Sequence, residues 1–279
     1  MIDYATAVLG ILVATLIPIF ISLYIVTNLK FIKLQYLAMA GIGLAFWFFY
    51  DTMGNAAAIG VDDGFGGGLP HVGVVIVFLA GITALAIIDR AAVPETSVYE
   101  TSDPKTVSKY SKLIFLIPAG TAFVMGLHGF GEGWDFSSAA SGVQTGSLLD
   151  AFGGGMSAIV SYLLHKTLEA VIIAVVYVAF VGRSSFAAKK IWHLPVLAIL
   201  FGMQSVLGAA TGYYVSFDTT YFYAFGVTSA FYATIRLAEA VNPNFMIGKG
   251  NPIRISTAGF IALAIGFLLL YSAALFHNG

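Results

Sequence analysis

The chain has 279 residues, of which 59% are hydrophobic and only 10% are charged, whereas soluble domains carry about 25% charged residues. This balance and the mean hydropathy of +0.90 exclude an ordinary soluble domain and indicate an integral membrane protein. The net charge of -1 excludes nothing by itself, but the lack of a long basic run gives nucleic-acid binding no electrostatic basis, and the lack of cysteine excludes disulfides and thiolate metal sites.

Apolar runs long enough to cross a bilayer, which takes about 20 residues, recur along the whole chain. They occupy residues 5–27, 34–60, 71–90, 113–136, 156–182, 194–215, 221–241 and 255–276. Because they are too long and continuous for barrel strands, they predict eight transmembrane helices. The first run lacks the positive segment of a signal peptide, so it predicts a retained helix. No connection is long enough for a second domain, so residues 1–279 are predicted to be one all-α, polytopic membrane domain.

The basic residues are distributed unequally between alternate connections. With the N-terminus outside, the inner connections hold eleven of the 13 Lys and Arg residues and the outer ones hold none. The other two, Lys166 and Arg236, lie within apolar runs. Because cytoplasmic loops are enriched in Lys and Arg, this asymmetry predicts a multi-pass cell-membrane protein with both termini outside.

Two apolar runs contain histidine and glutamate at the same spacing. The stretch MGLHGFGEGWDF holds His128 and Glu132, with Asp135 one turn further on, and LLHKTLEAV holds His165 and Glu169. Residues four apart share one helix face. His128 lies roughly 22 Å from the inner end of its run, and His165 lies roughly 13 Å from the outer end of its run. Because consecutive runs are antiparallel, we expect both pairs to meet inside the membrane.

Such a group of imidazoles and carboxylates suits a divalent transition metal. Ionisable groups inside a bilayer are costly and indicate function, and this ligand set suits zinc, iron or manganese. The glycines at 129, 131 and 133 would let the helix bend, or let ions approach its backbone. The alternative is that each His–Glu pair is only an intrahelical hydrogen bond. Arg236 and Glu239, three residues apart near an inner helix end, are predicted to pair structurally.

The motifs resemble those of the ZIP (Zrt-/Irt-like) family of divalent metal transporters. Members have eight transmembrane helices with both termini outside, a motif like H-N-x-P-E-G in the fourth helix and one like H-x-x-P-E-[GE] in the fifth. This chain has HGFGEG at 128–133 and HKTLEA at 165–170. Gly131 and Leu168 replace the motif prolines, and Gly129 replaces the asparagine.

The resemblance implies a metal site formed by His128, Glu132, His165 and Glu169. It implies that the first, fourth, fifth and sixth helices form a moving unit, while the other four form a scaffold with a homodimer contact. Asp51 resembles an acidic residue on the family's access route, and Gln204 lies on a helix that often supplies a ligand. Their alternatives are a locally hydrogen-bonded Asp51 and a helix–helix hydrogen bond from Gln204.

Lys166 stands where two-metal members of the family place a ligand. One helix step rotates a side chain by about 100°, so we expect Lys166 to border the site without sharing the face of His165 and Glu169. Its ammonium is expected to pair with Glu132 or Glu169, to compensate their charge and to replace a second metal. The alternative is that Lys166 reaches towards the membrane surface or loses its proton.

The expected function is transmembrane transport of a divalent cation, most simply zinc and otherwise iron or manganese, by alternating access. The metal is then the substrate, and no covalent chemistry is implied, so the protein is not expected to be an enzyme. The first alternative is a membrane-embedded metalloenzyme, although di-iron bundles draw ligands from four helices. The second is a non-transporting accessory subunit with a degenerate site.

Overall fold

The computed structural model describes residues 2–57, 72–92, 113–142, 156–182, 192–215, 217–241 and 256–275, and its regular structure there is entirely α-helical. Within these ranges the chain forms eight helices, each close to one of the predicted runs. They are α1 (Tyr4–Asn28), α2 (Leu34–Ala57), α4 (Val72–Ala92), α7 (Leu116–Gly142), α9 (Met156–Phe180), α10 (His193–Gly212), α11 (Thr220–Val241) and α12 (Thr257–Leu275).

Helix α7 extends beyond its predicted end at residue 136. Its last turns contain small residues with no proline, and the helix ends at Gly142. Phe136 and Ala140, four residues apart on one face, belong to a buried apolar cluster with residues of α1 and α10. This apolar contact continues the helix past the polar stretch, where the prediction placed a loop.

Five of the described helices are long and apolar enough to cross a membrane, judged by length and composition. They are α1, α2, α4, α9 and α10. Helices α7 and α11 do not meet these criteria, and the described apolar part of α12, Thr257–Leu270, is shorter than a span. The described part of the chain therefore fits a helical membrane protein, with eight helices and five clear candidate spans.

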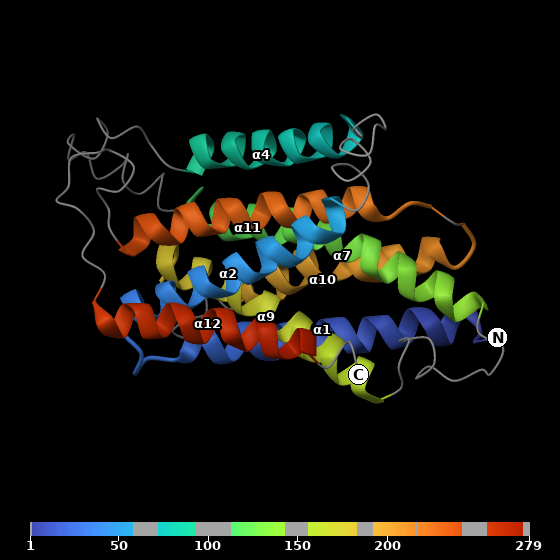
Figure 1. The fold of residues 1–279 in the computed structure, drawn as a ribbon, viewed down its shortest axis with the longest axis horizontal. Coiled ribbons are helices and arrows are strands. Elements are labelled where there is room, and N and C mark those ends of the chain that lie inside the picture. Colours follow the sequence, from blue (N-terminus) through green and yellow to red (C-terminus); the bar gives the residue numbers. More distant parts are fainter. Residues whose placement is uncertain are drawn as a thin grey trace.

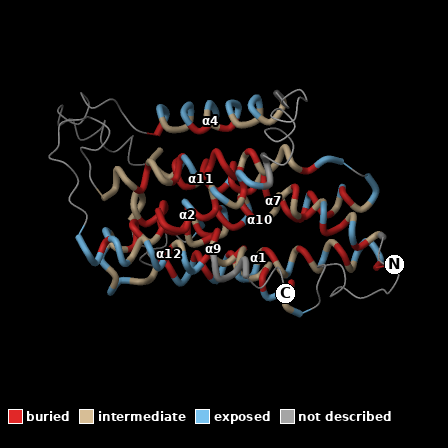
Figure 2. The backbone as a smooth tube through the Cα atoms, in the orientation of Figure 1, coloured by how far each residue is buried: buried red, intermediate tan, exposed pale blue. Residues whose placement is uncertain are grey.

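The helices run along a common long axis (Figure 1), and their contacts form two interlocking sets. In the first set, α10 packs on α7, and α1 packs on both α9 and α10. In the second set, α2 packs on α11 and α12, and α4 packs on α11. Contacts of α7 with α11 and of α2 with α9 join the two sets. Buried residues concentrate where the sets meet, whereas α4 is largely exposed along its outer side (Figure 2).

The most extensive helix contact in the described part of the chain, between α7 and α10, is made through glycine. A methyl group on Gly208 of α10 would clash with the carbonyl oxygen of Phe130 and lie 2.8 Å from its carbonyl carbon. Gly133 of α7 meets the backbone of Ser205 in the same way. Small residues allow such close backbone approach between membrane helices. Gly133 is therefore a packing residue, and α7 is helical without interruption across the three glycines.

Candidate functional site

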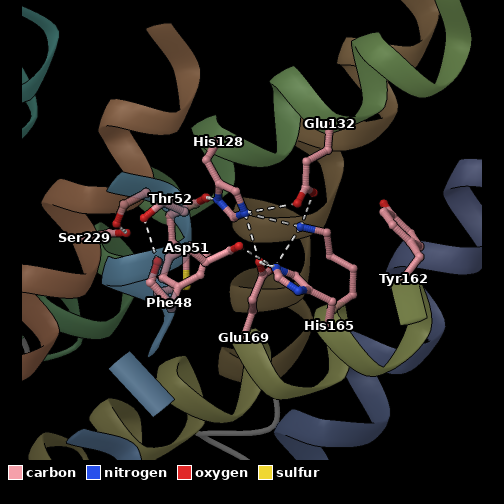
Figure 3. Close-up of polar contacts among 12 residues, drawn as sticks. Phe48, Asp51, Thr52, His128, Glu132, Tyr162, His165, Glu169 and Ser229 are labelled. Carbon is pink, nitrogen blue, oxygen red and sulfur yellow. Dashed lines mark hydrogen bonds and ion pairs between the residues drawn. The ribbon is translucent and has the colours of Figure 1, made fainter. Parts of the chain in front are cut away.

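The candidate site lies between the middle of α7 and the middle of α9. His128 and Glu132 project from α7 towards His165 and Glu169 of α9 (Figure 3). The two His–Glu motifs thus meet, as predicted from their similar depth along the two antiparallel runs. His128, Lys166 and Glu169 are completely buried. A buried charge is costly unless it is paired, so the contacts of these groups determine what the site can do.

Glu169 connects the polar groups of the site. Its Oε1 atom lies 3.0 Å from Nε2 of His128 and 2.8 Å from Nε2 of His165. Its Oε2 atom accepts a hydrogen bond of 2.7 Å from the ammonium of Lys166. One carboxylate therefore contacts both histidines and the lysine, which fixes its orientation in the interior of the helix bundle.

The imidazole of His128 is held by its own helix and by α2. Its Nδ1 atom contacts the carbonyl oxygen of Met125. Since a carbonyl oxygen can only accept, Nδ1 carries a proton, and Nε2, which faces the carboxylate of Glu169, can offer a lone pair to a cation once it has released its own proton. The buried ring of Phe48 packs edge-on against this imidazole, with centroids 4.8 Å apart. The ring is therefore oriented from both sides before any ligand binds.

Lys166 lies inside the site instead of bordering it. Its Nζ atom forms ion pairs with Glu132 and Glu169, and it lies 3.4 Å from Nε2 of His128. The prediction named one of the two carboxylates, and the structure pairs the ammonium with both. The prediction of a separate face was wrong because residues three apart are neighbours on a helix, and Lys166 and Glu169 have this spacing.

Three side chains have the geometry to share one metal ion. The ligand atoms of His128, Glu132 and Glu169 all lie within 4.8 Å of one another. His165 contacts this group through Glu169 and is not a member of it. Imidazole and carboxylate ligands suit zinc, iron and manganese.

Exposure rises from the centre of the cluster towards α2. Glu169 is fully buried, whereas the side chains of Glu132 and His165 are 16% and 19% exposed. Asp51 of α2 is 33% exposed, and its Oδ2 atom lies 3.9 Å from Nε2 of His165. His165 and Asp51 are therefore the more exposed groups on the α2 side of the buried carboxylate. Asp51 thus lies at the rim of the cluster and not at its centre.

Two candidate accessory residues lie outside the cluster. Asp135 accepts hydrogen bonds from the hydroxyl of Thr219, at 3.0 and 2.9 Å for its two oxygens, and is exposed. Gln204 of α10 lies against α7 at Gly126. Among the described residues, no polar contact joins Gln204 to His128 or to the carboxylates. Spacing alone indicated Asp135, but the next turn of α7 directs it towards the start of α11.

A second polar cluster joins α4 to α11. The predicted pair of Arg236 and Glu239 is present, and Arg236 also pairs with Asp89 of α4. The hydroxyl of Tyr232 donates to Asp89 at 2.6 Å. Sequence reasoning did not identify Asp89, because its partner lies on a helix far away in the chain. Arg236 is shared by the two carboxylates, and its pair with Asp89 attaches α4 to α11, so the role of the cluster is structural.

No family model, no curated protein and no solved structure matches this chain. The class of the protein is thus described by its fold and site alone. The described chain is all-helical and fits a membrane protein, and it holds a buried His, Glu and Lys cluster between two neighbouring helices.

Proposed function

We propose that the protein transports a divalent transition-metal cation across the membrane, with zinc as the first candidate and iron or manganese as the next. One observation carries this proposal. The ligand atoms of His128, Glu132 and Glu169 come from two helices and lie within 4.8 Å of one another in the bundle interior. Because ionisable groups are costly there, their convergence calls for a functional reason.

The resemblance of the two motifs to those of the ZIP family supports the same proposal. The helices expected to move together are α1, α7, α9 and α10, and these pack on one another. The expected scaffold helices α2, α4, α11 and α12 form the second set. In alternating access, sliding between the two sets would open the site first to one side and then to the other. A homodimer contact through the scaffold is part of this proposal.

Uptake by purified protein tests the function directly. Proteoliposomes that contain the wild-type chain and an internal zinc-sensitive dye should accumulate zinc faster than empty liposomes. Elemental analysis of protein purified without chelators provides the companion measurement. Uptake supports the transporter, whereas turnover of a substrate without uptake supports the membrane metalloenzyme. Bound metal with neither activity supports the accessory subunit, and either of these results contradicts the proposal.

The proposed topology makes an independent prediction. Because the chain has no cysteine, single-cysteine variants report on one position each. A cysteine at Ser141, in the last turn of α7, should react with an impermeant thiol reagent on intact cells. A cysteine at Ser108, which lies outside the described residues, should react only after the cells are opened. The reverse pattern would contradict the orientation and, with it, the comparison with the ZIP family.

A further inference from the structure

The position of the Lys166 ammonium has a consequence for cation binding. Nζ lies 2.7 Å from Oε2 of Glu169 and 3.4 Å from Nε2 of His128, and it also contacts Oε2 of Glu132. These three residues are the same ones whose ligand atoms form the candidate metal group. The ammonium thus lies among the atoms that would coordinate the cargo, and not at a neighbouring position.

A divalent cation and this ammonium cannot be held there together. Zinc requires ligand distances of about 2.0–2.2 Å, so an ion shared by the three ligands would lie where Nζ lies. Two cations at such short range repel one another strongly in a buried environment. Binding of the cargo therefore requires that the ammonium leave the carboxylates.

The surroundings of Lys166 offer a place for the displaced ammonium. Nζ is 5.4 Å from the centroid of the Phe201 ring and 5.9 Å from that of the Tyr162 ring. Aromatic faces attract ammonium groups at distances up to about 6 Å. If the flexible lysine side chain rotates towards these rings, cation–π attraction stabilises the ammonium while the carboxylates coordinate the metal ion.

We propose that Lys166 is a tethered substitute for the transported cation, which occupies the ligand group of His128, Glu132 and Glu169 whenever the cargo is absent. This inference rests on the proposed transport function and explains how the charge of the site is balanced when no metal ion is bound. Two buried carboxylates without a cation would be costly in the membrane. With the ammonium in place, the unloaded site is compensated, so the protein can reorient without carrying a second ion back.

The test is calorimetric titration of the purified full-length chain with zinc ion alone. Lys166→Met removes the competing charge at similar side-chain length, so it should bind zinc at least about tenfold more tightly than the wild type. Lys166→Gln is the second variant, because its amide can still donate to the carboxylates if Lys166→Met fails to fold. Lys33→Met, the same substitution outside the site, serves as the control and should leave the affinity unchanged.

The outcomes separate this inference from the proposed function. Equal or weaker zinc binding by the folded variants, compared with a wild type that binds zinc, overturns the role of Lys166 and leaves transport standing. Zinc binding by the variants but not by the wild type overturns zinc transport, and with it a role of Lys166 as the substitute for a transported zinc ion. Absence of binding in all of the proteins overturns both.

Discussion

Replacing Glu169 with glutamine is expected to lower zinc uptake by proteoliposomes on the order of a hundredfold or more. Glu169 is the only described side chain that contacts both histidines and the lysine of the site. Glutamine has nearly the same shape but no charge, and it presents one acceptor oxygen instead of two. The variant therefore loses a ligand and leaves Lys166 with a single carboxylate partner.

A matched control distinguishes loss of the site from loss of the fold. Glu239→Gln makes the same substitution in the cluster that joins α4 to α11, where Asp89 still pairs with Arg236. This variant should retain most of the uptake. Wild-type uptake by the Glu169 variant would remove this carboxylate from the transport path. Equal losses in both variants would instead indicate damage to folding.

The helices of this protein could be predicted from the sequence because bilayer length and apolar composition determine them locally. The ends of α9 and α11 fall within two residues of the predicted ones for this reason. The end of α7 could not be found in this way. Its last turns are stabilised by the burial of Phe136 and Ala140 in an apolar cluster with α1 and α10, which are distant in the chain.

The site could be predicted in part because its two motifs are local. Spacing placed His128 with Glu132 and His165 with Glu169, and antiparallel neighbours brought the pairs together. Spacing could not tell that Glu169 joins both histidines, since that requires the relative rotation of α7 and α9. The position of Lys166 was missed for a similar reason: a long flexible side chain goes where its partners are, and one of these partners, Glu132, is on the other helix.

Replacing glycine with alanine is expected to have opposite effects on stability at Gly208, where α10 packs on α7, and at Gly54 of α2, outside that contact. Gly208→Ala is expected to lower the free energy of unfolding by about 1–3 kcal/mol, because the added methyl group would meet the backbone of Phe130 and force α7 and α10 apart. A backbone carbonyl cannot rotate away as a side chain can. The measurement is the thermal unfolding midpoint of the purified chain in detergent, followed by circular dichroism.

Gly54→Ala provides the control, because a methyl group there has no neighbouring atom within 4 Å. Alanine favours a helix over glycine by roughly 0.5–1 kcal/mol, so this variant should unfold at the same temperature as the wild type or at a higher one. Destabilisation of both variants would point to a general intolerance of substitution. Equal stability of both would contradict the close contact of α7 and α10, and with it the packing that holds His128 and Glu132 in place opposite α9.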